Sequence, residues 1–249
     1  MELFPRLDPA TTALLLDVDG TLVEIKSSPD EVRVSADLRE LLARLSQQMG
    51  GALALVSGRP IADLDRLFAP LKLATIGGHG AEMRSAGGKV TLAVAPLPQD
   101  MRRHLAGAAA PGSGIVVEDK GYSLALHYRN GPQHEKTLRA SIDAGRAAFP
   151  GEATEVQPGK FMFEVKRPGV SKGDAVRALM AQPPFAGRQP VFVGDDATDE
   201  TVFAILPALN GLGFSVGRHF AGLAGIFESP SQVRRALKDL AARGPGAPV

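Results

Sequence analysis

Runs of almost continuously apolar residues alternate with helix-like segments in the first part of the chain. Three such runs, TALLLDV, GALALVS and LKLATIGG, occupy residues 12–18, 51–57 and 71–78. A strand that is apolar on both faces has to be covered on both sides, which is typical of parallel sheets. The segments between the runs have the apolar spacing of helices. The pattern therefore predicts an α/β fold, a doubly wound, Rossmann-like parallel sheet with right-handed crossovers.

Two of the expected helices carry recognisable start signals. Ser35 is placed to cap a helix that runs to Met49, and Pro60 falls in the first turn of a helix to Phe68, where its missing N–H costs nothing. The alternation resumes late in the chain. There the pattern predicts helices over 171–180, 199–205 and 231–241 and strands over 189–196 and 211–216. The core domain is thus expected in two parts, residues 1–95 and 167–249.

The pattern changes near Gly80. The segment AEMRSAGGKVTLAV indicates a hairpin that turns at residues 86–88. The predicted elements beyond it are a helix over 99–109, strands over 114–118 and 122–128, a helix over 133–149 and two strands within 152–165. Paired strands without a helix between them indicate an inserted, smaller α+β domain, to which we assign residues 96–166.

Composition excludes several classes of protein. The 249 residues contain no cysteine, which excludes disulfides, thiolate zinc sites and cysteine nucleophiles. The formal net charge is +1 and no long Lys/Arg run occurs, so we expect no nucleic-acid partner. No apolar stretch approaches the ~20 residues that cross a bilayer, and MELFPRLDPA lacks the features of a secretory signal. We therefore expect a cytoplasmic monomer without a membrane partner.

Acidic residues stand at the ends of the predicted strands. DVDGT follows the first strand, SGR the second and GDDATDE a late one, while SKGD opens the helix before that late strand. In a doubly wound sheet, ligands bind outside the carboxyl ends of the strands. Asp17 and Asp19 are two positions apart and can project to the same side. Two such carboxylates repel unless one is protonated or a cation lies between them.

Further side chains near these ends suit a phosphate and a hard cation. Asp195 and Asp199 offer more carboxylate oxygens, and such a cluster favours Mg²⁺, which binds through carboxylates together with substrate phosphate. Gly20 allows a tight turn. Thr21 and Ser57 offer hydroxyl donors for an anion, and the Lys172 ammonium offsets charge that develops during phosphoryl transfer.

Each fragment alone has a plainer interpretation. DVDG is also typical of an ordinary turn, and GDDATDE of a helix start whose acids favour the dipole. Ser57 and Lys172 taken singly are more often a cap and a surface charge. An EF-hand is excluded, because the required acids are missing and a strand precedes DVDG. The occurrence of all four fragments at predicted strand or helix ends favours a reaction site.

In the order DVDGT, SGR, SKGD and GDDATDE, in which they occur along the chain, the four fragments resemble the motifs of haloacid-dehalogenase-like phosphatases. The insertion is similar to the C2-type cap of that superfamily. Within the superfamily, the chain resembles the trehalose-6-phosphate phosphatases from about Leu14 to Glu200. The strings that carry this narrower likeness are GTLVEIKSSPDEVRV, GGHGAE, VEDKGYSLALHYR and QPGKFMFEVKRPGVSKG, with GDDATDE.

The resemblance implies a mechanism and a set of roles. Asp17 would be the nucleophile that forms an aspartyl-phosphate, and Asp19 the acid/base. Mg²⁺ would be held by Asp17, the backbone carbonyl of Asp19 and Asp195, with Asp196 and Asp199 in or near that shell. The residues implied in phosphate binding are Thr21, Ser57, Gly58 and Lys172, and Arg59 would contact the substrate.

The cap would select the sugar. Glu118 and Lys120 share one face of their predicted strand, as do Lys160 and Glu164 on a predicted facing strand. The resemblance implies sugar contacts for Glu118, Lys120 and Glu164. His127, Arg129 and Lys160 are further candidates, for which a solvated sheet face is an equal alternative. His79 is a weaker candidate for substrate binding, because the glycines of GGHGAE indicate a tight turn in which the imidazole need have no role.

The resemblance thus leads us to expect a Mg²⁺-dependent phosphatase that hydrolyses trehalose 6-phosphate and has a small sugar phosphate as its partner. Another C2-capped enzyme, acting on sucrose phosphate or mannosyl-phosphoglycerate, or a phosphomannomutase, would share the core acids. A noncatalytic phosphosugar sensor is an alternative of a different class, against which the intact Asp17 and Asp19 weigh. A signalling receiver domain would leave the long insertion unexplained.

Overall fold

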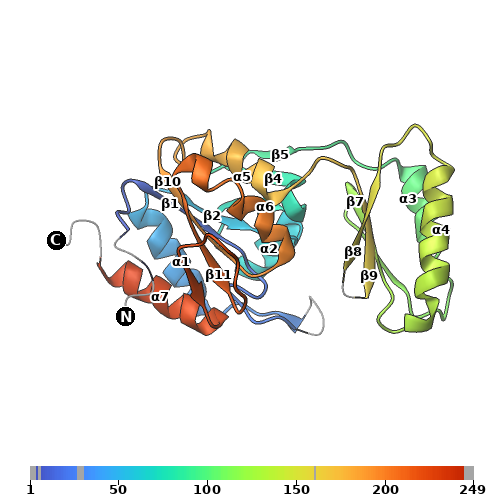
Figure 1. Ribbon diagram of the computed structural model, residues 1–249, viewed down its shortest axis with the longest axis horizontal. Helices are drawn as coiled ribbons and strands as arrows, with labels where there is room; N and C mark the ends of the chain where they lie inside the picture. The colour runs from blue at the N-terminus through green and yellow to red at the C-terminus, as the bar shows by residue number, and fades with distance from the viewer. Residues whose placement is uncertain (1–3, 5–6, 27–30, 160, 244–249) are drawn as a thin grey trace. The chain divides into compact units, whose positions relative to one another are not determined.

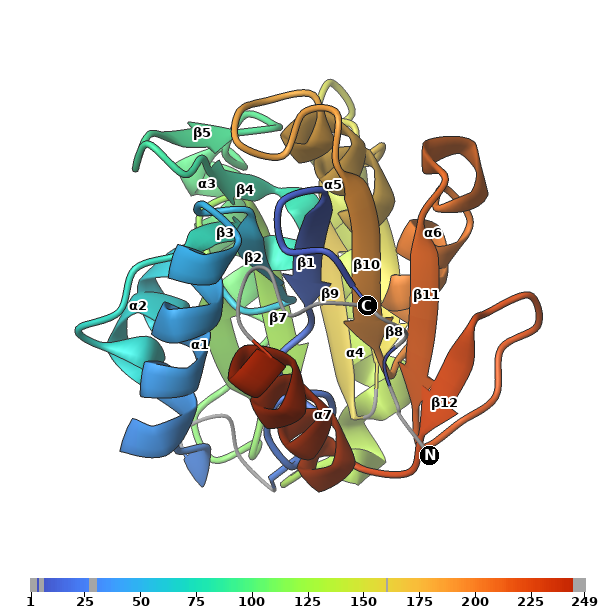
Figure 2. The same ribbon diagram turned by 90° about the vertical axis from the view of Figure 1, so that its left-hand side faces the viewer.

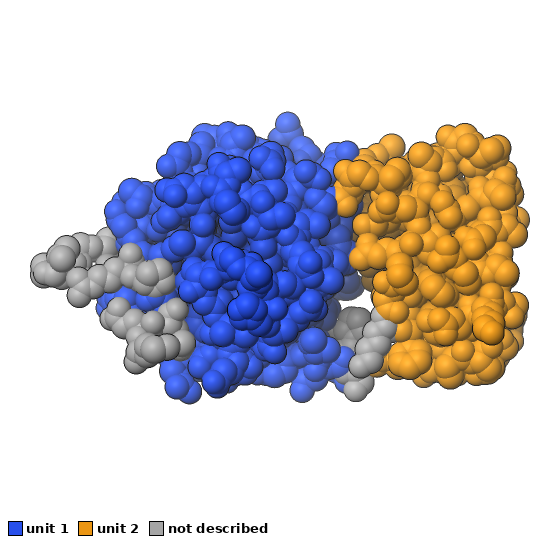
Figure 3. Space-filling model, viewed as in Figure 1, with its two compact units in different colours: residues 1–93, 171–249 blue, residues 94–170 orange. Residues whose placement is uncertain are grey.

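The computed structural model describes residues 4, 7–26, 31–159 and 161–243. These form two compact units, one built from residues 1–93 and 171–249 and the other from residues 94–170 (Figure 3). We call them the core unit and the second unit. None of the described helices is both long and apolar enough to pass through a bilayer.

The core unit contains an eight-stranded sheet in the order β12-β11-β10-β1-β2-β3-β4-β5. The strands are β1 (Thr12–Leu16), β2 (Leu53–Val56), β3 (Ala74–Gly77), β4 (Glu82–Arg84), β5 (Val90–Leu92), β10 (Gln189–Gly194), β11 (Leu212–Val216) and β12 (Gly225–Phe227). The six strands from β12 to β3 are parallel, and the β4–β5 hairpin adds an antiparallel edge. The predicted doubly wound α/β sheet is confirmed.

Helices cover both faces of this sheet, as its apolar strands require. They are α1 (Ala36–Gln48), α2 (Ile61–Phe68), α5 (Lys172–Met180), α6 (Glu200–Phe203) and α7 (Pro230–Arg243), with 3₁₀ turns η2 (Gly78–Gly80), η4 (Ala197–Asp199) and η5 (Pro207–Leu209). α1 packs against α7 and α5 against α6, and the two pairs lie on opposite sides of the strands (Figures 1 and 2). The strands β1, β2 and β10 are fully or almost fully buried between them.

Most predicted boundaries in the core unit hold to within two residues, although β3 begins three residues later than the run that predicted it. Three other features also differ from the prediction. Ser35 caps α1 by accepting a hydrogen bond from the Leu38 N–H, as predicted. Pro60, however, is the N-cap residue of α2 and lies just before its first turn. The helix predicted over 199–205 is split into η4 and a four-residue α6. The three-residue strand β12 was not predicted.

The second unit is a four-stranded antiparallel sheet with helices on one face. Its strands are β6 (Val116–Asp119), β7 (Ser123–His127), β8 (Glu155–Gly159) and β9 (Met162–Lys166), in the order β6-β7-β9-β8. Its helices are α3 (Gln99–Ala106) and α4 (Glu135–Ala147), with the 3₁₀ turn η3 (Pro132–His134). A separate apolar core joins the helices to the sheet, and includes Leu105, Leu126, Ile142 and Phe163. The expectation of a smaller α+β domain is therefore confirmed.

Candidate functional site

Three loops that carry predicted site residues leave the core sheet at the same edge. β1 lies between β10 and β2, and the chain continues in opposite directions from this point. Asp17 directly follows β1, Ser57 follows β2 and Asp195 follows β10. This is the topological switch point at which doubly wound sheets bind ligands. The structure therefore brings the acids of DVDGT and GDDATDE together, although 178 positions separate Asp17 from Asp195 in the chain numbering.

Lys172 is the first residue of α5, and its ammonium group lies between two carboxylates. Its Nζ donates hydrogen bonds to Asp199 Oδ1 at 2.7 Å and to Asp17 Oδ1 at 3.2 Å. The whole residue is only 2% exposed. Burial opposes the charged ammonium, but the charges of Asp17 and Asp199 outweigh it and raise the pKa of Lys172 above its usual value. A buried, permanently charged lysine is thus fixed beside the carboxylate of Asp17.

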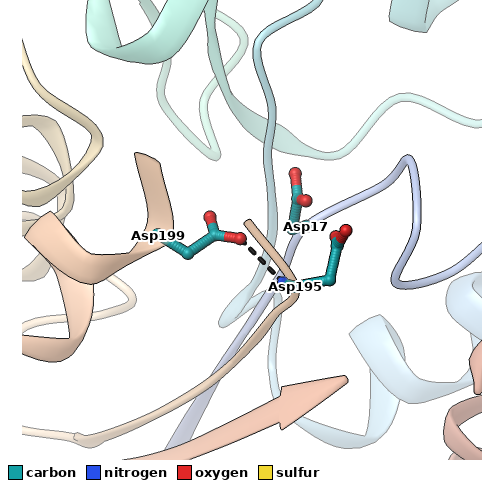
Figure 4. A group of neighbouring side chains, drawn as sticks. All are labelled: Asp17, Asp195 and Asp199. Atoms are coloured by element: carbon teal, nitrogen blue, oxygen red, sulfur yellow. Dashed lines mark hydrogen bonds between the residues drawn. The ribbon is translucent and has the colours of Figure 1, made fainter. Parts of the chain in front are cut away.

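Asp17, Asp195 and Asp199 each direct a carboxylate oxygen to a common space, and these oxygens lie within 4.8 Å of one another (Figure 4). Burial raises the pKa of Asp17 and of Asp199, and it raises the pKa of Asp195 to about 6. Three converging carboxylates that are each hard to ionise fit a divalent cation, which offsets their repulsion. The all-oxygen donor set suits Mg²⁺.

The remaining bonds of the cluster distinguish its members. Asp199 Oδ1 accepts from Lys172, and Asp199 Oδ2 accepts from the backbone N–H groups of Asp195 and Asp196 at 2.8 and 3.0 Å. Both oxygens of Asp199 are therefore used to hold Lys172 and the loop after β10. Asp17 accepts the Lys172 hydrogen bond through one oxygen, Oδ1. Asp195 accepts a hydrogen bond from the Thr21 hydroxyl at 2.9 Å, also through Oδ1. Both residues are better placed than Asp199 to offer an oxygen to a cation.

Asp196 has a structural task in the same loop. Its Oδ1 accepts hydrogen bonds from the Thr198 N–H at 2.8 Å and the Thr198 hydroxyl at 2.6 Å, so that it caps η4. Burial alone would raise the pKa of Asp196, but the charge of Lys172 and the bonds from Thr198 outweigh burial and lower it. Asp196 lies outside the group of three carboxylates that converge on one space.

Asp19, the predicted acid/base, forms an ion pair with Arg59. Arg59 Nε and Nη2 donate to the two oxygens of Asp19 at 2.6 and 2.8 Å, a bidentate pair that fixes the orientation of the carboxylate. Ser57 is buried, and its Oγ accepts the Arg59 N–H at 3.1 Å. The loop that carries Ser57, Gly58 and Arg59 therefore lies beside the loop that carries Asp19.

Gly20 lets the DVDGT turn pass close to Asp195. Its φ of +83° lies in the left-handed region, and a Cβ at this position would stand 2.1 Å from Asp195 Oδ2. Any side chain at residue 20 would displace the Asp195 carboxylate. The glycine is therefore required by the site as well as by the turn.

The polar residues predicted in the cap share one face of the second unit's sheet. Glu118, Ala125 and Glu164 occupy one row across β6, β7 and β9. The prediction that the two glutamates lie on facing strands is wrong, because β7 separates their strands and the small Ala125 stands between them. Ser123 and His127 are two positions from Ala125 and lie on the same face. The opposite face carries Leu124 and Leu126 into the apolar core.

Hydrogen bonds join these polar residues. Glu164 Oε1 accepts from the Ser123 hydroxyl at 2.7 Å and from Lys120 Nζ at 3.2 Å. Lys120 Nζ lies 4.0 Å from Glu118 Oε2, and His127 Nε2 lies 3.2 Å from the same oxygen. Glu118 and His127 are partly exposed, whereas Glu164 is only 3% exposed. Of the predicted sugar contacts on this face, Glu118 and His127 are thus accessible, whereas Lys120 is held between the two glutamates.

Other candidates lie elsewhere. Arg129 is exposed in the turn after β7, and Lys160 falls outside the described residues. Sequence reasoning missed Ser123, although its position two residues before Ala125 placed it on the polar face. It also assigned no part to Glu82 of GGHGAE, whose carboxylate accepts the Ile61 N–H at 2.6 Å.

Comparisons with known proteins match most of the chain. The model of the trehalose-phosphatase family matches residues 15–221. The chain belongs to the trehalose-phosphatase family. It is 41% identical to trehalose-6-phosphate phosphatase of Escherichia coli (strain K12) over 84% of this chain and 78% of that protein. It is also 41% identical to the probable trehalose-phosphate phosphatase of Sinorhizobium fredii (strain NBRC 101917 / NGR234), over 82% of this chain and 77% of that one.

A solved structure supports the same family assignment. The crystal structure of a trehalose-6-phosphate phosphatase related protein covers 92% of this chain and 96% of its own, with a TM-score of 0.73 and 25% sequence identity. The sequence resemblance to the trehalose phosphatases and to the haloacid-dehalogenase-like fold is thereby confirmed. As a member of this family, the chain is a phosphatase, a hydrolase of phosphoric monoesters.

Proposed function

We propose that the chain hydrolyses trehalose 6-phosphate to trehalose and phosphate, in a Mg²⁺-dependent reaction of trehalose biosynthesis. The observation that carries the proposal is the buried Asp17 carboxylate, which lies beside Lys172 and Asp195 at the switch point of a trehalose-phosphatase family chain. We further propose that the enzyme acts as a monomer in the cytoplasm on a small sugar phosphate, without nucleic-acid or membrane partners.

In the proposed mechanism Asp17 attacks the phosphorus atom. A bond forms between Asp17 Oδ and phosphorus while the bond from phosphorus to the sugar oxygen breaks, and Asp19 gives its proton to that departing oxygen. Asp19 then takes a proton from water, whose oxygen attacks phosphorus and releases phosphate and the Asp17 carboxylate. The bidentate pair with Arg59 supports this role, because it orients the Asp19 carboxylate.

The residues that would hold Mg²⁺ are Asp17, Asp195 and the backbone carbonyl of Asp19, with Asp199 and Asp196 around them. Bound Mg²⁺ supplies positive charge for the phosphate and for the crowded carboxylates. The contacts of Asp199 and Asp196 indicate that both hold other parts of the site in place. Asp199 holds Lys172, and Asp196 caps η4.

The phosphate oxygens would be bound by Thr21, Ser57, the Gly58 backbone and Lys172. Lys172 keeps its charge throughout, because two carboxylates raise its pKa. A fixed cation beside the nucleophile stabilises the charge that spreads over the phosphoryl oxygens without needing to reorganise. Arg59 would serve the substrate through its hold on Asp19.

We propose that the second unit, which the sequence analysis delimited as residues 96–166, is the cap that selects the sugar. Glu118, Lys120 and His127 would donate to or accept from sugar hydroxyls, while Glu164 orients Lys120. The hydrogen bonds that link these side chains on one polar face of the sheet support this proposal. Arg129 and Lys160 remain proposed substrate contacts that depend on the family resemblance.

A panel of phosphate esters tests the proposed substrate. Phosphate release is measured with Mg²⁺ from trehalose 6-phosphate, sucrose phosphate, mannosyl-phosphoglycerate and glucose 6-phosphate, with Asp17→Asn as the control. We expect the highest kcat/KM on trehalose 6-phosphate and no turnover by Asp17→Asn. A preference for another sugar phosphate would assign the chain to a different C2-capped activity. Binding of trehalose 6-phosphate without turnover would indicate a sensor.

A further inference from the structure

We propose that Glu82 is a positioning residue for the proton-transfer step, because it fixes the backbone that carries Arg59, the partner of Asp19. The inference rests on the proposed function in one respect: it takes Asp19 as the acid that protonates the leaving group. Glu82 lies on β4, in the GGHGAE segment to which neither the mechanism nor the cap gives a task.

Glu82 supplies a hydrogen-bond acceptor at the start of α2. Ile61 is the first residue of this helix, and its N-cap residue is Pro60, which makes no side-chain capping hydrogen bond. Helix N-termini leave backbone N–H groups that need acceptors, and a carboxylate there also suits the helix dipole. Glu82 Oε2 accepts the Ile61 N–H at 2.6 Å. The Glu82 carboxylate, on β4, thus supplies the capping hydrogen bond that the Pro60 side chain cannot make.

The backbone just before α2 is also held by the GGHGAE segment. The Arg59 carbonyl accepts the Gly78 N–H at 3.0 Å, and the Ser57 carbonyl accepts the His79 N–H at 3.1 Å. A Cβ on Gly58 would lie 2.4 Å from the His79 ring, so the imidazole packs directly on this loop. His79 itself has a φ of +55°, a backbone state that is costly for a residue with a side chain.

These contacts give the GGHGAE segment a common task. It is bonded to the loop of residues 57–61 at three points. Two of these bonds join backbone groups, and the third is made by the Glu82 side chain. Such strained turns persist where the surrounding structure determines them and where a site needs a fixed geometry. The segment therefore acts as a support on which the backbone of Arg59 rests.

The side chain of Arg59 connects this backbone to Asp19. The Arg59 guanidinium is a planar fork that holds both oxygens of Asp19, at 2.6 and 2.8 Å. A bidentate pair transmits the position and tilt of the guanidinium to the carboxylate. General acid catalysis depends strongly on such placement, since the proton must be within hydrogen-bond reach of the departing oxygen. Displacement of Arg59 would therefore impair protonation of the leaving group.

The test uses two esters of similar size whose leaving groups differ in basicity. Phenolate from phenyl phosphate needs a proton as it departs, whereas p-nitrophenolate leaves easily without one. The comparison uses kcat/KM, which covers the departure of the leaving group but not the later hydrolysis of the aspartyl-phosphate, a step that both esters share. We expect Glu82→Ala to lower kcat/KM on phenyl phosphate at least about tenfold, a small part of the 10²–10⁴-fold that general acid catalysis contributes. On p-nitrophenyl phosphate it should lower kcat/KM less than about threefold, a difference that loss of folded enzyme alone cannot produce, because that loss affects both esters equally.

Three further variants complete the test. Glu82→Gln keeps an acceptor oxygen and should remain within about threefold of the unchanged enzyme on both esters, since one retained hydrogen bond is the proposed task. Asp63→Ala removes a carboxylate of the first turn of α2 that does not accept the Ile61 N–H. It should leave unchanged the ratio of kcat/KM on p-nitrophenyl phosphate to kcat/KM on phenyl phosphate. Asp19→Asn should raise the ratio further than Glu82→Ala does.

The outcomes separate this inference from the proposed function. Equal losses on both esters in Glu82→Ala, or none, with a raised ratio in Asp19→Asn, would overturn the positioning role and leave the acid role of Asp19 intact. An unchanged ratio in Asp19→Asn would overturn that acid role, and the inference with it. If Glu82→Ala does not fold, Glu82→Asp, whose shorter side chain retracts the acceptor, takes its place with the same expectation.

Discussion

Lys172 and its two carboxylates show how individual residues in this site depend on one another. The ammonium contacts both Asp17 and Asp199 and is almost inaccessible to solvent. Each of the three groups would be costly to bury alone, and removal of one partner leaves an uncompensated charge. The contact between a cation and the proposed nucleophile therefore serves the fold and the chemistry together.

We predict that Lys172→Met is both less stable and inactive. The free energy of unfolding should fall by about 3–5 kcal/mol, the usual cost of breaking a buried ion pair on one side, and kcat should fall at least about 100-fold, as on loss of a fixed electrostatic donor. Chemical denaturation and phosphate release measure the two effects. Lys72→Met, which removes an exposed lysine of the core unit, is the control. Retained activity in Lys172→Met would contradict its proposed phosphate contact.

The acidic cluster predicts a pH dependence of metal binding. Burial raises the pKa of Asp195 from 3.8 to about 6, so the metal-free folded state holds protons that the unfolded state releases. This contribution to stability is complete below about pH 4 and is lost as the pH rises through 6. Mg²⁺ competes with these protons. The rise in melting temperature on adding Mg²⁺ should therefore be larger at pH 7 than at pH 5.

Thermal unfolding with Mg²⁺ and with a chelator, at a series of pH values, measures this effect. Asp195→Asn, which has no proton to lose at this position, should show a smaller rise at pH 7 than the unchanged protein. A rise that is the same at pH 5 and pH 7 would argue against metal binding by the converging carboxylates.

At the scale of elements, the start of α5 positions a candidate site residue. Ser171 caps α5 by accepting the Asp174 N–H at 3.1 Å, and Lys172 follows it directly. Ser35 caps α1 in the same manner, but α1 carries no candidate site residue. The same capping interaction therefore occurs beside a candidate site residue in α5 and away from the site in α1, so α1 is a control for α5.

We predict that Ser171→Ala and Ser35→Ala each lower the free energy of unfolding by about 1 kcal/mol, the usual contribution of a side-chain cap. Only Ser171→Ala should also lower kcat, because fraying of the first turn of α5 moves Lys172 away from Asp17. Denaturation curves and phosphate release with saturating substrate measure both properties. Equal kcat values in the two variants would show that the α5 cap does not position Lys172.

Elements with long, regular patterns could be predicted from the sequence, and short ones could not. The apolar runs at residues 12–18 and 51–57 are central strands, because continuous apolar character reports burial on both faces. The strand β12 has three residues at the sheet edge, too few for any periodicity. The division of residues 197–203 into η4 and α6 follows from the Asp196 cap, a local bond that apolar spacing does not record.

At the scale of the whole molecule, the proposed function gives the two units different tasks. The core unit holds the acids that the four motifs predicted, because strand ends that are adjacent in a parallel sheet meet at one edge. The polar face of the second unit could be predicted only from the alternation of side chains between the two faces of a strand. Its hydrogen bonds could not, because Ser123 and Glu164 meet through strand pairing across 41 positions. The same holds for Glu82 and Ile61 in the core unit.

This division predicts that sugar selection and chemistry can be separated. Hydrogen bonds to a charged group contribute about 1.5–3 kcal/mol, so Glu118→Ala should lose roughly 10–100-fold in kcat/KM on trehalose 6-phosphate. On p-nitrophenyl phosphate, which has no sugar, the variant should match the unchanged enzyme. Asp143→Ala, which removes an exposed carboxylate from α4, is the control in the same unit. Equal losses on both esters would argue against a sugar-selecting face.

The covalent step at Asp17 is the central claim, and the Asp19→Asn variant tests it most directly. With p-nitrophenyl phosphate the first step needs no acid, whereas hydrolysis of the aspartyl-phosphate still needs Asp19 as base. Acid quenching after mixing with this ester and Mg²⁺, followed by peptide mapping by mass spectrometry, measures the accumulated intermediate. We predict a peptide that contains Asp17 and one added phosphoryl group, absent from a variant that also carries Asp17→Asn. Release of p-nitrophenol without phosphorylated Asp17, or with the phosphoryl group on another residue, would contradict the account.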